Sequence, residues 1–267
     1  MAVIENGGTR IEVVQVGRGR ELVALHSLLT DRSAFDRILP RLARHYRVTL
    51  LSLPGFGASS PVRPGIWNYA DWVSEAFDML GLTPEADVLG NGFGGSVALA
   101  FAAKHGNRLR RLVLADAVAS FPAEARGAFR DMADRVKLGG MEAILEVAVR
   151  RLFTDDYIQA HPHLLDACRS VLLRMEPQAF IVACETLAGL NMVATDIVKS
   201  ALVIVGEHDT ATPAPLCRAL ADSLPRGVYR EIPDCAHAPQ IQKPEIFLEL
   251  VESFLAQADE TIDQAHP

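Results

Sequence analysis

The sequence predicts an α/β protein with a mostly parallel sheet of about eight strands and helices on both faces. Short apolar segments alternate with helical ones along residues 1–119 and again along residues 200–257. Apolar strands of five or six residues are typical of a parallel sheet that is covered on both faces. Residues 120–199 contain only helical patterns, which predicts a cap of four helices over the sheet. Residues 258–267 are predicted to be a loosely ordered tail.

Eight segments have the pattern of strands. The first two flank the turn signal Asn6-Gly7-Gly8 and are expected to form an antiparallel hairpin. The predicted strands cover 2–5, 11–16, 21–26, 48–53, a segment beginning at Ala86, 111–116, 201–206 and 228–232. Helical spacing of apolar side chains predicts helices over 33–44, up to Gly81, after Gly92, over 214–224 and over 244–256. In the cap, the predicted helices are 123–137, 141–153, 163–174 and 177–190.

Length and composition exclude several classes of function. The net charge of −7 at pH 7 argues against a nucleic-acid-binding protein, because such proteins need a basic face to neutralise phosphates. No apolar run reaches the roughly 18 residues that span a bilayer, and the N-terminus lacks the pattern of a secretion signal. The four cysteines have no paired spacing. We therefore expect a cytoplasmic protein that binds neither membranes nor nucleic acid; the sequence gives no indication of its oligomeric state.

The segment from Ala86 to Gly106 predicts a strand, a glycine-rich turn and a helix. Its turn, Gly90-Asn91-Gly92-Phe93-Gly94, has the frame G-x-S-x-G of a nucleophile elbow, the sharp turn that exposes a catalytic serine at the end of a strand. Gly92 occupies the serine position. The same residues also satisfy the dinucleotide-binding pattern G-x-G-x-x-G through Gly90, Gly92 and Gly95. The turn alone is therefore compatible with both interpretations.

Polar residues at the ends of other predicted strands favour the elbow. These are His26-Ser27, Asp209 and His237, and ligands of open parallel sheets bind beyond the carboxyl ends of the strands. The order elbow, acid, histidine is that of a hydrolase triad, in which the imidazole moves a proton and the carboxylate fixes its tautomer. A dinucleotide-binding pattern normally opens the sheet, and it leaves these residues unexplained.

The chain resembles the α/β-hydrolase family, and within it the 3-oxoadipate enol-lactonase-like members, over nearly its whole length. The segments that carry the resemblance are HSLLTDRSAFDRILPRLARHYRV, PGFGASS, the elbow, VIVGEHDTATP and IPDCAHAPQIQKPEIFLELVESFL. The resemblance implies an α/β-hydrolase fold with a selective cap, Asp209 as triad acid and His237 as general base. It also implies an oxyanion hole formed by the backbone N–H groups of Leu28 and Phe93. Three positions depart from the family pattern: Gly92 replaces the expected Ser, Ser52 replaces an Asp, and Ala236 replaces a Gly.

Other polar residues have competing interpretations. We expect His26, Ser27 and Asn91 to line the substrate pocket, with a turn role for the Ser27 hydroxyl. Ser96 is expected to have a helix role, Cys235 a packing role, and Asp116 a capping or turn role, with Asp116 also a fallback acid. Five arginines of the cap are candidates to bind a substrate carboxylate, and none stands out from the sequence: Arg126, Arg130, Arg150, Arg151 and Arg174.

We therefore predict an enzyme without cofactor or metal that acts on a small lactone, ester or enol-acid carbonyl compound. The dyad of His237 and Asp209 is the predicted general base, with water at the vacant nucleophile position, Gly92. The same dyad also suits a lyase or isomerase reaction that needs no covalent intermediate. Two alternatives remain open: a non-catalytic, ligand-binding degenerate hydrolase, and a dinucleotide-dependent enzyme that uses Gly90, Gly92 and Gly95.

Overall fold

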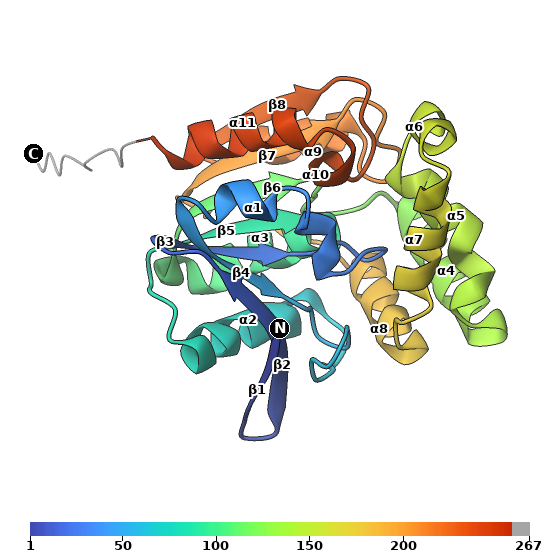
Figure 1. The fold of residues 1–267 in the computed structure, drawn as a ribbon, viewed down its shortest axis with the longest axis horizontal. Coiled ribbons are helices and arrows are strands. Elements are labelled where there is room, and N and C mark those ends of the chain that lie inside the picture. Colours follow the sequence, from blue (N-terminus) through green and yellow to red (C-terminus); the bar gives the residue numbers. More distant parts are fainter. Residues whose placement is uncertain (258–267) are drawn as a thin grey trace, which may run out of the picture.

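The fold is known from a computed structural model that describes residues 1–257; the predicted tail, 258–267, lies outside the described residues. Eight strands form one sheet in the order β1-β2-β4-β3-β5-β6-β7-β8 (Figure 1). The pairs β1–β2 and β2–β4 are antiparallel and all other pairs are parallel, which confirms the predicted sheet. The strands are β1 (Ala2–Asn6), β2 (Thr9–Val16), β3 (Arg20–Leu25), β4 (Tyr46–Leu51), β5 (Ala86–Asn91), β6 (Leu109–Ala115), β7 (Ser200–Gly206) and β8 (Gly227–Ile232).

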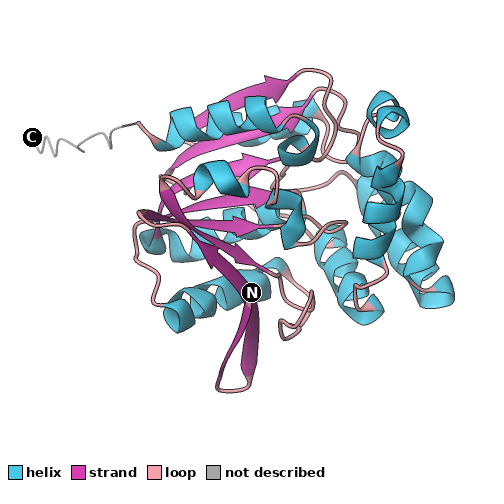
Figure 2. Ribbon diagram, viewed as in Figure 1, coloured by secondary structure: helices cyan, strands magenta, loops and turns pink. Residues whose placement is uncertain are grey.

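Helices cover both faces of the sheet, as predicted (Figure 2). Buried apolar side chains form two clusters, one on each face. The first cluster includes side chains of α2 (Ile66–Leu80), α3 (Phe93–His105) and α9 (Ala214–Ser223). The second includes side chains of η1 (Arg32–Phe35), α1 (Leu39–Leu42) and α11 (Pro244–Leu255). Two short helices complete this part of the chain: η2 (Gly106–Arg108) and α10 (Pro239–Gln242).

The local sequence explains the elements around the predicted elbow. All six residues of β5 are buried, as expected of a strand in the middle of a parallel sheet. In α3 the ten residues from Phe93 to Ala102 are buried, and a helix that is apolar on all sides belongs in the interior. Helix α2 ends at Gly81, whose φ of +61° is the left-handed conformation that glycine adopts at helix ends.

The segment between β6 and β7 contains five α-helices rather than the predicted four. They lie beside the carboxyl ends of the strands, at the right of Figure 1. The additional helix is α6, six residues long and capped by the Thr154 hydroxyl, which accepts the Tyr157 N–H. Six residues are too few to show a helical period, so the sequence pattern missed it. The insert consists of α4 (Ala123–Gly139), η3 (Met141–Ile144), α5 (Leu145–Leu152), α6 (Asp155–Ala160), α7 (His163–Leu172) and α8 (Pro177–Ala188).

The predicted helix over 33–44 is also divided, into η1 and α1. Pro40 lies in the first turn of α1. Because proline lacks an N–H and its ring clashes with the preceding turn, the helix has to begin anew there.

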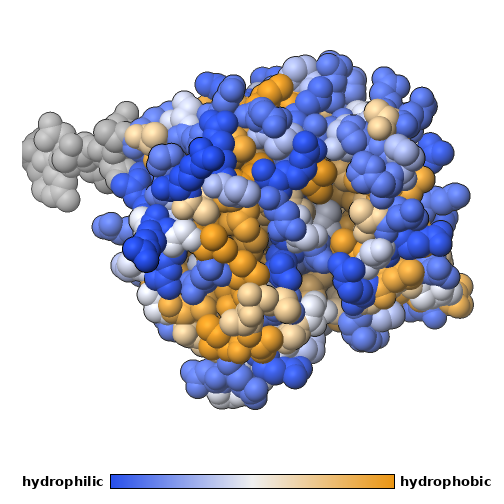
Figure 3. Space-filling model, viewed as in Figure 1, coloured by the Kyte–Doolittle hydropathy of each residue, from blue (hydrophilic) through white to orange (hydrophobic). Residues whose placement is uncertain are grey.

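Two features concern the surface. Apolar side chains on the face shown in Figure 3 gather over the region of β1 and β2, where Met1, Val3 and Val16 are exposed. Among residues 1–257, no helix is both long enough and apolar enough to span a membrane.

Candidate active site

The predicted site residues meet at one edge of the sheet. Strands β3, β5, β6, β7 and β8 are consecutive neighbours and run parallel, so their carboxyl ends lie in a row. The segments that follow these strands carry Ser27, Gly92, Asp116, Asp209 and His237, in that order. This is the edge at which open parallel sheets bind their ligands.

His237 and Asp209 form a buried dyad. His237 Nδ1 lies 2.8 Å from Asp209 Oδ2. Asp209 also accepts the N–H groups of Ala211 and Thr212, at 2.7 and 3.0 Å, and the Thr212 hydroxyl at 2.5 Å. Burial alone would raise the pKa of Asp209, but the charge of His237 and the hydrogen bonds from His237 and Thr212 lower it to about 2. The ionised carboxylate holds the proton on Nδ1, so that the Nε2 lone pair is left to accept a proton.

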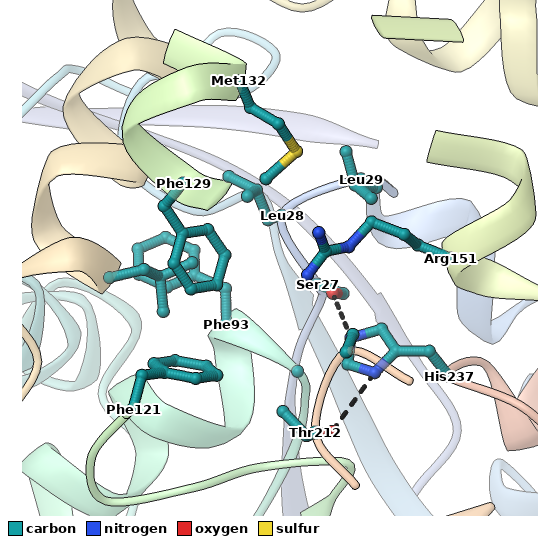
Figure 4. A pocket seen from close by; sticks show the side chains of 13 residues that line it. Ser27, Leu28, Leu29, Phe93, Phe121, Phe129, Met132, Arg151, Thr212 and His237 are labelled. Carbon is teal, nitrogen blue, oxygen red and sulfur yellow. Dashed lines mark hydrogen bonds between the residues drawn. The ribbon is translucent and has the colours of Figure 1, made fainter. Parts of the chain in front are cut away.

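The volume beside Gly92 is filled by Ser27. Gly92 joins β5 to α3 with a φ of +54°, a conformation that residues with a Cβ rarely adopt. A Cβ at Gly92 would overlap Ser27 Oγ and would lie 2.7 Å from His237 Nε2. Ser27 Oγ itself lies 3.4 Å from His237 Nε2 (Figure 4). The Ser27 side chain therefore occupies part of the volume that a side chain at position 92 would fill, and attack by water beside Gly92 stays a prediction.

A small, mainly apolar pocket opens at the dyad. Figure 4 shows Phe121, Phe129 and Met132 on one side of it, and Arg151 pointing towards Ser27. The pocket volume is about 30 Å³, which holds only a few water molecules. Its lining consists of Ser27, Leu28, Leu29, Gly92, Phe93, Phe121, Phe129, Met132, Arg151, Leu187, Ala211, Thr212 and His237.

Leu28 and Phe93, the predicted oxyanion-hole residues, both line this pocket. The Leu28 N–H has no backbone acceptor within residues 1–257. Phe93 is the first residue of α3, and the N–H groups of a first helical turn have no acceptor within their own helix. Both residues thus line the pocket and have a backbone N–H without a backbone partner among those found; that these N–H groups form an oxyanion hole stays a prediction.

His26, predicted to line the pocket, does not; it fixes the loop that carries Ser27. The Leu53 N–H donates to His26 Nε2 at 3.0 Å, which leaves the ring proton on Nδ1. Nδ1–H then donates to the Ser27 carbonyl at 2.9 Å. Burial lowers the pKa of His26, and the hydrogen bond to Ser27 opposes this only in part. His26 is therefore a neutral positioning residue.

Asn91 also lies outside the pocket lining, behind the dyad. Its amide donates to Asp116 Oδ2 at 2.9 Å and to the His237 carbonyl at 3.2 Å. Asp116 accepts the Gly206 N–H at 3.1 Å. Burial, and then repulsion by Asp209, raise the pKa of Asp116 well above its usual range. Asp116 is thus a buried hydrogen-bonding group behind Asp209, and the carboxylate that contacts His237 is that of Asp209.

Of the remaining candidate residues, one arginine lines the pocket, whereas Ser96 and Cys235 do not. The Ser96 hydroxyl donates to the Val118 carbonyl at 3.0 Å, as expected for a helix role. Burial raises the pKa of the Cys235 thiol, which is not among the pocket-lining residues. Of the five cap arginines, Arg151 alone lines this pocket. Its sequence signal is weak: it follows the buried Ala148 by three residues and so shares its side of α5.

Packing explains the glycines that match the dinucleotide pattern. A Cβ on Gly90 would collide with the backbone of Gly94, and a Cβ on Gly95 would lie 2.5 Å from Ala117 Cβ. The glycines therefore allow α3 to approach the strands closely. A dinucleotide-binding pattern also needs an acidic residue about twenty residues further on to bind the ribose; Asp116, the acid in that place, is completely buried. Both observations count against the dinucleotide-dependent alternative.

Comparison with known proteins gives a consistent result. Residues 22–250 match the model of the alpha/beta hydrolase family. The chain is 31% identical to 2-hydroxymuconate semialdehyde hydrolase of Pseudomonas putida, across 82% of this chain and 80% of that protein. It is 29% identical to pimeloyl-[acyl-carrier protein] methyl ester esterase of Aeromonas hydrophila, across 92% of this chain and 99% of that one. The structure of the enol-lactonase from Burkholderia xenovorans superimposes with a TM-score of 0.90 at 26% identity, covering 96% of this chain and all of that chain, 100%. The chain belongs to the alpha/beta hydrolase family.

Proposed function

We propose that this protein hydrolyses a small lactone, ester or enol-acid carbonyl compound, with His237 and Asp209 as its catalytic base. The observation that carries the proposal is the buried dyad: Asp209 holds Nδ1 of His237 at 2.8 Å, and His237 lines the pocket. The similar proteins are named a semialdehyde hydrolase, a methyl ester esterase and an enol-lactonase. Each of these substrate classes contains a carbonyl group, which supports hydrolysis at such a group.

The proposed reaction begins when a hydroxyl group attacks the carbonyl carbon and His237 Nε2 takes its proton. The Asp209 carboxylate stabilises the imidazolium that forms, and the imidazolium then gives the proton to the leaving group. The N–H groups of Leu28 and Phe93 are the proposed donors to the oxyanion. Donors that face developing charge in a site without bulk water commonly give the largest single contribution to such catalysis.

Arg151 supports a substrate that carries a carboxylate. No ion pair or hydrogen bond of its guanidinium is found within residues 1–257, and the group lies 5.8 Å from the Phe129 ring centre. Burial lowers the pKa of Arg151, and the charge of Asp209 opposes this; a guanidinium remains charged in either case. An unpaired cation in an apolar pocket favours an anionic group on the substrate, so we propose an apolar substrate that ends in a carboxylate.

Turnover by active-site variants tests the proposed function. The substrates are a panel of small lactones, aryl esters and enol acids, each with and without a carboxylate. We expect His237→Ala to lower kcat/KM by about 10³-fold or more, since the loss of a triad histidine has effects of this size. His45→Ala, at an exposed histidine, is the matched control and should stay near the wild-type rate. Equal rates for wild type and His237→Ala, or no turnover of any compound, would contradict the proposal and favour a binding protein.

A further inference from the structure

We propose that Ser27, on the loop after β3, is the nucleophile of this hydrolase in place of a residue at position 92. The inference rests on the proposed function, because it names the hydroxyl from which His237 takes a proton. It differs from the expectation of the sequence, in which water attacks beside Gly92 and Ser27 has a turn role.

The Ser27 hydroxyl lies close to His237, where a side chain at position 92 would otherwise be. Its Oγ overlaps the volume that a Cβ at Gly92 would fill, and it lies 3.4 Å from His237 Nε2. Nucleophile and base usually lie about 2.6–3.2 Å apart, and the distance is often longer before a substrate binds. The serine is thus in hydrogen-bonding reach of the base, at the point in space where the elbow would present its own side chain.

The pairing of two strands explains how a different loop reaches this point. Leu25 of β3 pairs with Gly90 of β5 in a parallel register. Ser27 and Gly92 each follow two residues after this pair, so they leave the sheet side by side. Only a glycine at position 92 leaves room for the Ser27 side chain, because Ser27 Cβ would lie 3.0 Å from a Cβ there.

Hydrogen bonds hold Ser27 in this position. Its N–H donates to Thr30 Oγ1 at 3.1 Å, and its carbonyl accepts the Thr30 N–H at 3.3 Å. The same carbonyl accepts Nδ1–H of the buried His26. These bonds fix the backbone that carries the Ser27 hydroxyl, and a nucleophile positioned before the substrate arrives loses less freedom in the reaction.

The other hydroxyl and thiol groups near the dyad have different partners. The pocket-lining residues contain two hydroxyls, and that of Thr212 donates to Asp209. The Ser96 hydroxyl donates to Val118, and Cys235 does not line the pocket. Ser27 is therefore the pocket hydroxyl that the geometry leaves for His237.

The covalent steps are those of an acyl transfer. The Ser27 proton passes to His237 Nε2 as Ser27 Oγ bonds to the carbonyl carbon, whose π electrons move to its oxygen. The N–H of Leu28, the residue after the nucleophile, and the N–H of Phe93 face this oxyanion. The tetrahedral adduct then expels the leaving group, which takes the proton from His237, and an acyl ester remains on Ser27. Water then gives a proton to His237 and bonds to the acyl carbon; the bond to Ser27 Oγ breaks, His237 returns the proton to this oxygen, and the acid is released.

Covalent labelling tests the proposal without the natural substrate. The probe is diethyl p-nitrophenyl phosphate, which phosphorylates an activated serine and releases p-nitrophenolate. We expect one label per wild-type chain, located on Ser27 by peptide mass spectrometry. Ser27→Ala and His237→Ala should take up none, whereas the control Ser170→Ala, at an exposed serine of α7, should be labelled like wild type. Absence of label on wild-type Ser27, or a label on another residue, would overturn the proposal.

Turnover separates this inference from the proposed function. If Ser27 is the nucleophile, Ser27→Ala should lose about 10³-fold or more in kcat/KM, as His237→Ala does. If Ser27→Ala keeps its turnover while His237→Ala loses it, water is the nucleophile: the base function stands and the assignment of Ser27 is wrong. Circular dichroism melting curves of each variant establish that it is folded, and the wild-type label requires no variant.

Discussion

Ser27 and Gly92 share one volume at the ends of β3 and β5, so a side chain at one position requires glycine at the other. At Gly92 the backbone adds a second constraint, because its φ is +54°. A non-glycine residue in such a conformation is strained by about 1–3 kcal/mol. Together these constraints predict how the two positions respond to substitution.

Gly92→Ser alone should lower the free energy of unfolding by at least about 1–3 kcal/mol, from strain and from overlap with Ser27. It should also lower turnover, because the new side chain displaces Ser27 from His237. In Ser27→Gly the overlapping atoms are gone, so adding Gly92→Ser to that variant should recover activity that neither single variant has. Urea unfolding and kcat/KM on an aryl ester measure both effects.

The matched control is Gly127→Ser, because a Cβ at Gly127 of α4 meets no atom within 4 Å. It should leave both stability and turnover close to wild type. A Gly92→Ser variant that is as stable and as active as wild type would show that the two positions do not compete for this volume.

Among the helices, α5 places the guanidinium of Arg151 at the pocket and that of the adjacent Arg150 on the surface. Arg151 lines the pocket, whereas the exposed Arg150 pairs with Asp155. The two arginines are adjacent in sequence and differ in their direction from the helix. Replacing either arginine removes one positive charge from α5, but only the replacement of Arg151 removes a charge from the pocket.

Arg151→Gln should raise KM for carboxylate-bearing substrates about 10- to 100-fold, because a hydrogen bond to a charged group contributes about 1.5–3 kcal/mol. Substrates of the same shape without the carboxylate should be little affected. Arg150→Gln should change neither. Steady-state kinetics with the paired substrates measures this difference, and an equal loss on both members of each pair would indicate a packing role for Arg151.

Much of the architecture follows from local sequence. The central strands β3 to β7 were predictable because they are mostly buried apolar runs, and the exposed hairpin of β1 and β2 because of its Asn6-Gly7-Gly8 turn. The C-cap at Gly81 was predictable because glycine adopts positive φ. The short α6 was missed because its six residues make fewer than two helical turns. The division of the helix over 33–44 did have a local signal, Pro40, which the periodicity of apolar side chains does not register. In the site, Asp209 and His237 are recognisable from chain order. The contact of Ser27 with His237 was not, because it follows from the register between β3 and β5, which no local pattern contains.

On the scale of the whole molecule, the buried His26 links stability to pH. Burial lowers the pKa of His26 in the folded protein, whereas in the unfolded chain a histidine titrates near its ordinary value of about 6.5. Below that pH the unfolded state binds more protons than the folded state. The free energy of unfolding should therefore fall as the pH decreases from about 6.5 towards the lowered pKa, by at most about 1.4 kcal/mol per pH unit for this group.

Urea unfolding at a series of pH values from about 7.5 down to about 5, a series that includes the ordinary histidine pKa of about 6.5, tests this link. His26→Asn should be less stable than wild type at pH 7.5 and should show a shallower decline on acidification. His45→Ala, which removes an exposed histidine, should keep the wild-type slope. If His26→Asn declines as steeply as wild type, another group is responsible for the pH dependence.

The adjacency of β3 and β5 has a consequence for classifying hydrolases. The loops after β3 and β5 both lie beside His237, so the attacking atom can be supplied by either loop within reach of the same base. In this chain the triad becomes Ser27, Asp209, His237, with its first member far upstream of the elbow. A genome survey that counts every chain without an elbow serine as an inactive homologue would discard such enzymes. Before such a chain is classified as inactive, the residue two positions after the strand that pairs with the elbow strand, here Ser27 after β3, should be inspected.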